Sequence, residues 1–133
     1  IGKLGDREFV RAFQVMDRII QKNHPLFILT WAGSALLLLG SVFLGIGVLP
    51  PALWSALIVA TVAYFVGVQL PTLVINVPLN NALQEVDAEL ASLEAVQAAR
   101  RDFEAKWNRW NRRRTVVATA VTVVLLLLLL TVG

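Results

Sequence analysis

Two short polar clusters in this chain contain the residue types that could bind or transform a ligand. In the first, Asn76 and Asn80 are four residues apart, so a helix would place both on one face. A carboxamide both donates and accepts hydrogen bonds, and could therefore hold the carbonyl group of a ligand. Pro78 lies between the two asparagines and lacks an N–H group, so these amides could instead cap a helix break and satisfy its free backbone groups. The sequence leaves both interpretations open.

The second cluster precedes the last apolar segment and combines aromatic, amide and cationic groups. Trp107, Trp110, Asn111 and Arg114 follow the spacing i, i+3, i+4, i+7 and therefore form one stripe of a helix. If this stripe faces the two asparagines, it would line a polar pocket open to flat aromatic ligands. The alternative is an aromatic belt at the membrane surface, with arginines that extend to the lipid headgroups.

His24 is the single histidine of the chain and stands directly before Pro25. It would act as a general base if a partner oriented it, and Asp17 is seven residues earlier. A purely structural role is the other interpretation. A metal would need ligands from outside this chain, because there is no second histidine, no cysteine and no carboxylate in the apolar segments. We therefore predict no metal site and no cofactor.

Charge is segregated along the 133 residues, and this pattern indicates the elements that position both clusters. The 12 Lys and Arg and the 9 Asp and Glu residues all fall within residues 3–22 and 85–114. Three uncharged segments, 26–48, 52–75 and 115–132, are long enough to cross a membrane as helices. The first extends about 34 Å as a helix, against a hydrocarbon core of about 30 Å. We predict an all-α integral membrane helical bundle, with residues 1–133 as a single membrane domain.

Two further helical segments are expected outside the spans. An amphipathic helix is predicted over 6–23. Its apolar face consists of Phe9, Phe13, Met16 and Ile20. A polar helical loop is predicted over 82–114, with a break somewhere within it. The turn at 49–51 contains two prolines and joins the first two spans as an antiparallel hairpin.

The basic residues predict the orientation, because cytoplasmic segments next to spans are enriched in Lys and Arg. We expect a multi-pass protein of the cell membrane, with 1–23 and 82–114 in the cytoplasm and the C-terminus outside. The net charge of +3 and the pI near 10 would also suit nucleic acid, but the basic residues border the spans. The expected partner is therefore the lipid bilayer and not nucleic acid. A homo-oligomer or a membrane complex is compatible with the sequence.

The two clusters resemble the bacterial and fungal family of small membrane proteins that includes the anthrone oxygenases. The shared pattern is Asn76-x-Pro78-Leu79-Asn80, Trp107-x-x-Trp110-Asn111-x-x-Arg114, and Phe13-Gln14 ahead of Asn23-x-Pro25 and Phe27. Members of this family typically have four spans, so the resemblance implies a further span before Ile1. In some members it also implies oxidation of an electron-rich polycyclic phenol by oxygen.

Two functions follow as hypotheses. The first is an oxygenase acting on a lipophilic aromatic substrate near the cytoplasmic interface. The resemblance makes Asn76, Asn80, Asn111 and Arg114 candidate catalytic residues and Trp107 and Trp110 candidate substrate-binding residues, and His24 is added as the candidate base. The second is a non-catalytic membrane subunit that packs against partner proteins. A transporter or channel is disfavoured, because no ionisable residue lies within the spans.

Overall fold

Three helices of the chain are long and apolar enough to cross a membrane, as the sequence predicts. The computed structural model describes residues 1–21 and 25–132, and these ranges contain helices and turns and no strand. In chain order the elements are α1 (Asp6–Gln21), α2 (Pro25–Leu44), α3 (Pro51–Tyr64), the π-helical turns η1 (Phe65–Gln69) and η2 (Thr72–Asn76), α4 (Val77–Gln84) and α5 (Leu93–Val132). The predicted all-α membrane bundle is confirmed.

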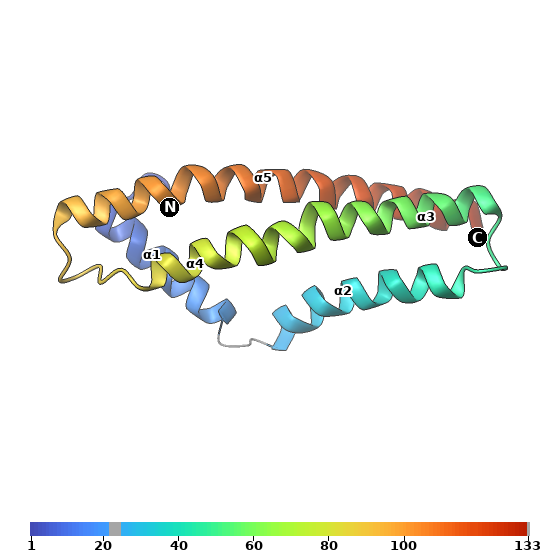
Figure 1. The fold of residues 1–133 in the computed structure, drawn as a ribbon, viewed down its shortest axis with the longest axis horizontal. Coiled ribbons are helices and arrows are strands. Elements are labelled where there is room, and N and C mark those ends of the chain that lie inside the picture. Colours follow the sequence, from blue (N-terminus) through green and yellow to red (C-terminus); the bar gives the residue numbers. More distant parts are fainter. Residues whose placement is uncertain (22–24, 133) are drawn as a thin grey trace.

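The helices are arranged lengthwise, with one short helix across one end (Figure 1). The rod formed by α3, η1, η2 and α4 packs against α5 along its length, and α2 lies beside α3. At the far end from the α2–α3 hairpin, α1 packs against α4 and α5. We call this the charged end, because residues 1–5, α1, the 85–92 turn and the first half of α5 carry all the charged residues that the structure describes.

The hairpin between α2 and α3 depends on glycine and on an indole contact. Gly47 has a φ of 71°, a conformation that glycine adopts without steric cost. Pro51 begins α3 in the first turn, where its missing N–H leaves no bond unmade. The Nε1–H group of Trp54 donates to the carbonyl of Val42 at 3.0 Å and ties α3 to α2. Both predicted spans of this hairpin are therefore helical and antiparallel.

Each π-helical turn stands just before a proline. The N–H of Leu70, which precedes Pro71, bonds the carbonyl five residues back, and so does the N–H of Val77, which precedes Pro78. A proline ring clashes with the carbonyl four residues earlier in an α-helix, and the wider π turn relieves that clash. The helix break considered around Pro78 therefore does not occur, and the chain stays helical over Pro51–Gln84.

The π-helical turns also bury polar side chains of this rod. Gln69, Thr72 and Asn76 are buried, while Leu70 and Leu73 beside them are exposed. An apolar residue exposed on a span faces lipid without cost, so the rod presents leucine to the bilayer and amides to the bundle interior.

The hydrophobic core lies at the charged end. Phe9, Val10 and Phe13 of α1 are buried against Leu83 of α4 and Phe103 of α5. By contrast, Leu38 is the only described residue of α2 that is buried. The main cluster of buried apolar side chains therefore lies where α1 crosses the bundle, and α2 faces outward, as expected of a helix in lipid.

The polar segment predicted over 82–114 is divided differently in the structure. α4 ends at Gln84, a turn occupies 85–92, and α5 then runs without interruption over Leu93–Val132. The predicted boundary at 114/115 is therefore not a helix boundary. The charged half of α5 continues into the apolar half because no proline or glycine interrupts it before Gly133.

Candidate functional site

A buried carboxylate joins α1 to α4. Asp17 is only 3% exposed, and its two oxygens accept hydrogen bonds from Asn80 Nδ2 at 2.7 Å and from Gln84 Nε2 at 2.9 Å. Asn80 and Gln84 are four residues apart on α4, so both amides reach the same carboxylate. Charge-assisted hydrogen bonds of this kind are about twice as strong as neutral ones. This contact fixes where α1 crosses the bundle.

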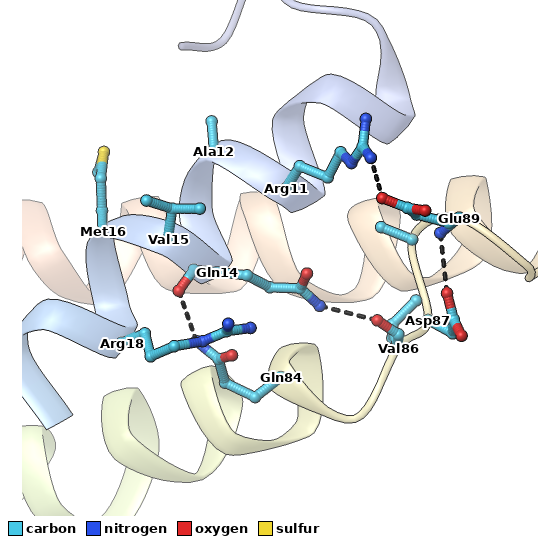
Figure 2. Close-up of a pocket in the computed structure, with 11 residues that line it drawn as sticks. Arg11, Ala12, Gln14, Val15, Met16, Arg18, Gln84, Val86, Asp87 and Glu89 are labelled. Carbon is cyan, nitrogen blue, oxygen red and sulfur yellow. Dashed lines mark hydrogen bonds and ion pairs between the residues drawn. The ribbon is translucent and has the colours of Figure 1, made fainter. Parts of the chain in front are cut away.

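Gln14 secures the same junction one turn earlier on α1 (Figure 2). Its Nε2 donates to the carbonyls of Leu83 and Val86 at 2.7 and 2.8 Å, at the end of α4. Its own backbone carbonyl accepts a bond from Gln84 Nε2 at 3.0 Å. Carbonyls at the end of a helix need partners from outside it, so Gln14 supplies a donor to Val86 and adds a second one to Leu83, whose carbonyl also accepts from the Val86 N–H at 3.3 Å.

Trp107 connects this junction to α5. Its Nε1–H donates to Asn80 Oδ1 at 3.0 Å, so Asn80 bridges Trp107 and Asp17. The indole ring packs on Phe13 and Phe103, with centroid distances of 5.1 and 6.0 Å. We call Gln14, Asp17, Asn80, Gln84 and Trp107 the paired network.

Further into the bundle, buried polar atoms have no such partners. Asn76 is 2% exposed, and neither its Nδ2 nor its Oδ1 has a hydrogen-bond partner within the described ranges. It also caps nothing, since α4 has no side-chain cap bond at its start. The capping interpretation of Asn76 is therefore wrong. A buried polar group without a partner costs about 1–3 kcal/mol, so this amide requires an explanation.

Arg114 is a second such group. Its Nε is buried and has no hydrogen-bond partner among the described residues. α5 contacts both π-helical turns, so Arg114 and Asn76 belong to elements that pack against each other. Gly67 allows this close approach, because a Cβ there would lie 2.7 Å from Val117 Cγ1.

A third set of polar groups connects α2 with the rod. Tyr64 Oη and Ser34 Oγ are 2.7 Å apart, and Gln69 Nε2 donates to Tyr64 Oη at 3.3 Å and to the carbonyl of Trp31 at 3.2 Å. Gln69 Oε1 and Trp31 Nε1 are nevertheless buried without a partner in the described part of the chain. We call Trp31, Gln69, Asn76 and Arg114 the unpaired layer.

The remaining predicted site residues do not converge on one pocket. Trp110 lies under the guanidinium of Arg113, 5.0 Å from its ring centroid, and lines a shallow hollow with Gly67 and Pro71. Asn111 is half-buried, and its carbonyl accepts a bond from the Thr115 hydroxyl at 2.9 Å. The predicted inward stripe is therefore divided: Trp107 enters the core, whereas Trp110 faces a separate hollow.

His24 lies outside the described residues. Among those described, no three His, Cys, Asp or Glu side chains form a group that could hold a metal ion.

The hollow drawn in Figure 2, with a volume of about 780 Å³, lies between α1 and the turn after α4. Gln14 and Gln84, which line it, already bond to backbone and to Asp17. At its rim Arg11 pairs with Glu89. Because these polar groups are paired, this hollow is a weaker ligand site than the unpaired layer.

Sequence reasoning missed Asp17 and Gln84 as neighbours of Asn80, and Gln69 and Trp31 as members of a site. A signal was present, because Gln69, Asn76 and Asn80 recur on one side of an otherwise apolar rod. Uncharged polar residues repeated on one side of a span indicate an interior polar path.

These features define a small helical membrane protein whose interior contains amide groups on one long helix, a tryptophan and an arginine on the next, and a carboxylate from the crossing helix. The family model of anthrone oxygenase matches residues 13–124, which include both polar clusters. The chain therefore belongs to the anthrone oxygenase family, and the resemblance in its sequence motifs is confirmed. No curated protein and no solved structure matches the chain.

Proposed function

We propose that this protein is an oxygenase that converts a lipophilic hydroxylated anthrone into the corresponding anthraquinone, with the reacting edge of the substrate at Asn76 and Arg114. The observation that supports this most directly is the pair of unpartnered amide atoms of Asn76, in a residue that is 2% exposed. Membership of the family supports the substrate class. It does not establish the activity, since a shared fold can serve several functions.

The proposed reaction replaces the ring methylene of the anthrone by a carbonyl. Loss of one methylene proton gives an enolate, whose electrons add to dioxygen at that carbon and form a hydroperoxide after protonation. The second methylene hydrogen and the outer oxygen then leave as water, breaking the O–O bond and leaving a C=O group. One oxygen atom enters the product, and the other is reduced to water.

Asn76 and Arg114 suit the oxygen-bearing edge of this substrate. The Asn76 amide can donate to a developing peroxide through Nδ2 and accept from the hydroperoxide O–H through Oδ1. Arg114 Nε–H can donate to the same oxygens. Donors that are in place before charge develops stabilise it without reorganisation, and burial strengthens the effect. An amide cannot accept the methylene proton, so His24 remains our proposal for the base.

We also propose that the charged end faces the cytoplasm. The support is the concentration of basic residues at that end, which matches the bias of cytoplasmic segments. The bilayer is then the immediate partner of α2 and of the apolar half of α5. A lipophilic substrate would dissolve in the same bilayer.

Turnover is tested with the purified full-length protein in lipid nanodiscs, a hydroxylated anthrone and dissolved oxygen. We expect anthraquinone formation above the rate of protein-free nanodiscs, with one oxygen molecule consumed per product. Asn76→Leu should lower kcat/KM at least 100-fold, about 2.7 kcal/mol, as expected for a lost transition-state donor. Arg114→Ala and Asn111→Ala are compared in the same assay, and the exposed Asn108→Leu is the matched control.

Equal turnover in wild type and Asn76→Leu would remove Asn76 from the mechanism. No turnover by correctly folded wild-type protein would favour the alternative function, a non-catalytic membrane subunit. Orientation is tested with single cysteines in this cysteine-free chain. An impermeant reagent added outside should label Val48→Cys and should not label Ser92→Cys until the membrane is permeabilised. The reverse pattern would invert the proposed orientation.

A further inference from the structure

An apolar groove lies between α2 and the π-helical turns, away from the charged end. Its walls include Ala32 and Ala35 of α2 and Phe65 and Leu73 of the rod, and its volume is about 590 Å³. Leu36, Val66 and Leu70 are 68%, 60% and 52% exposed and also line it. Because apolar side chains exposed on a span face lipid, the groove opens sideways into the bilayer.

Two polar atoms in the wall of this groove have no partner. Trp31 and Gln69 both line it, and Trp31 Nε1 and Gln69 Oε1 are buried and unpaired among the described residues. Gln69 is 5% exposed. Gln69 Nε2 bonds the backbone carbonyl of Trp31 at 3.2 Å, so the Gln69 side chain lies against α2 at Trp31. The two unpaired atoms are covered by the apolar side chains of the wall, so a ligand that moves these side chains aside meets one N–H donor and one carbonyl acceptor.

We propose that this groove is the substrate-binding and specificity site for a flat polycyclic ketone that carries a hydroxyl group next to its carbonyl. The ligand carbonyl accepts the Trp31 Nε1–H bond, and the neighbouring hydroxyl donates to Gln69 Oε1. The small side chains of Ala32 and Ala35 leave room for the rings against α2. This inference rests on the proposed function for the ring system, and it adds the residues that select the hydroxylated edge.

The position of Asn76 agrees with this arrangement. Gln69 and Asn76 are both buried on the same rod, and their seven-residue separation is about 10 Å along a helix axis. A substrate whose keto edge binds Trp31 and Gln69 would direct its opposite edge, which holds the methylene carbon, toward Asn76. The groove would then determine recognition and access from the bilayer, and Asn76 with Arg114 would act on the oxygen that adds.

The test measures binding of hydroxyanthraquinone, which cannot be oxidised in this reaction, to the full-length protein in nanodiscs. Trp31→Phe is the cleaner variant, because it removes an N–H group that bonds to no other described residue. We expect its Kd for hydroxyanthraquinone to rise about tenfold, which corresponds to about 1.4 kcal/mol for one lost hydrogen bond. Gln69→Leu should raise the same Kd about tenfold. Trp54→Phe, the same change at the hairpin, should leave it unchanged.

A second ligand separates the two contacts. Anthraquinone without a hydroxyl group should bind Gln69→Leu as well as it binds wild type, but should bind Trp31→Phe more weakly. If wild type, Trp31→Phe and Gln69→Leu bind hydroxyanthraquinone equally well, the proposal that this groove binds the substrate is wrong. Absence of saturable binding to wild type would also contradict it.

Turnover measured on the same preparations keeps the two proposals distinguishable. If the protein turns over substrate but binding does not depend on Trp31 or Gln69, the proposed oxygenase function stands and the groove is not the substrate-binding site. If binding depends on both residues but there is no turnover, the groove stands as a ligand-binding site and the proposed oxygenase function is wrong.

Discussion

Buried polar groups occupy two neighbouring regions of this bundle and are treated differently in each. At the charged end, Asp17, Asn80 and Trp107 bond to one another. One turn before Asn80 on the same rod, Asn76 is buried more deeply than the half-buried Asn80 and bonds to no described residue. The two asparagines are four residues apart and have similar sequence surroundings, so residue type and position alone do not reveal their roles.

Hydrogen-bond pairing therefore separates structural amides from amides that are free for a ligand. The hydrogen bonds of the Asn80 amide offset the free-energy cost of removing it from water, and its bond to Asp17 fixes the position of α1. A buried amide without a partner lowers the stability of the fold. Such an amide is retained at functional sites, where a bound ligand supplies the missing hydrogen-bond partner.

The largest effect is expected from truncation of the aromatic core beneath the paired network. Phe13 is buried, and its ring lies 4.4 Å from that of Phe103. Phe13→Ala should lower the free energy of unfolding by about 3–5 kcal/mol, since it removes apolar contacts and leaves a cavity. Phe43, which is 73% exposed on α2, is the matched control, and Phe43→Ala should cost far less in bicelles. Similar losses for both variants would contradict a main hydrophobic core at the charged end.

An identical substitution in the two regions should have different effects on stability. Trp107→Phe removes the donor to Asn80 and leaves the amide oxygen of this half-buried residue unpaired, at a cost of about 1 kcal/mol. Trp31→Phe removes a donor without a described partner, so it should leave the free energy of unfolding within about 0.5 kcal/mol of wild type. Thermal unfolding followed by circular dichroism measures both. A Trp31→Phe variant as unstable as Trp107→Phe would show that the Trp31 N–H is paired.

The close approach of the rod to α5 is the next point to test. Gly67→Ala would bring a Cβ to 2.7 Å from Val117 Cγ1, and overpacking of this kind costs about 1–3 kcal/mol. Gly40→Ala meets nothing within 4 Å and should be neutral or slightly stabilising. Val117→Ala should rescue Gly67→Ala. If rescue fails, another contact must account for the loss.

The smallest effect is expected at an exposed carboxylate, where water can replace a lost partner. The backbone N–H groups of Leu90 and Glu89 donate to Asp87 and hold the pKa of its carboxyl below the ordinary value of 3.8. A lowered folded-state pKa stabilises the fold above the unfolded value, and this contribution is lost as pH falls through the folded value. Asp87→Ala should therefore lower the melting temperature slightly at pH 7, with a difference that shrinks below pH 3.8. A difference that grows on acidification would contradict this sign.

The spans could be predicted from charge segregation, because a long uncharged apolar run has few other stable environments than lipid. The amphipathic helix over 6–23 could also be predicted, since Phe9 and Phe13 repeat at helical spacing. The π-helical turns could not, because a proline in a span predicts a kink or a wide turn equally well. The continuity of α5 through Arg114 could not be predicted either, because the sequence changes there from charged to apolar residues and this change resembles the start of a separate span.

The candidate site stays a prediction, although the structure shows where its residues lie: Asn76 is buried, and Asn80 and Trp107 are half-buried. The bond from Asn80 to Asp17 depends on α1, and nothing in the sequence states which face of α4 this helix covers. Gln69 and Trp31 were hidden for a related reason. Their proximity arises from the hairpin and from the extra residue in a π turn.

The most direct test of the account compares Asn80→Leu with Asn76→Leu in bicelles, with and without hydroxyanthraquinone. We predict that Asn80→Leu loses about 2–3 kcal/mol of unfolding free energy, because the buried Asp17 and the half-buried Trp107 each lose a hydrogen-bond partner. Asn76→Leu should be at least as stable as wild type. Ligand at 100 times its Kd should stabilise wild type and Asn80→Leu by about 2.7 kcal/mol each, and Asn76→Leu by much less. If Asn76→Leu is as unstable as Asn80→Leu, or gains the same stability from the ligand, then Asn76 is a structural amide and the account is wrong.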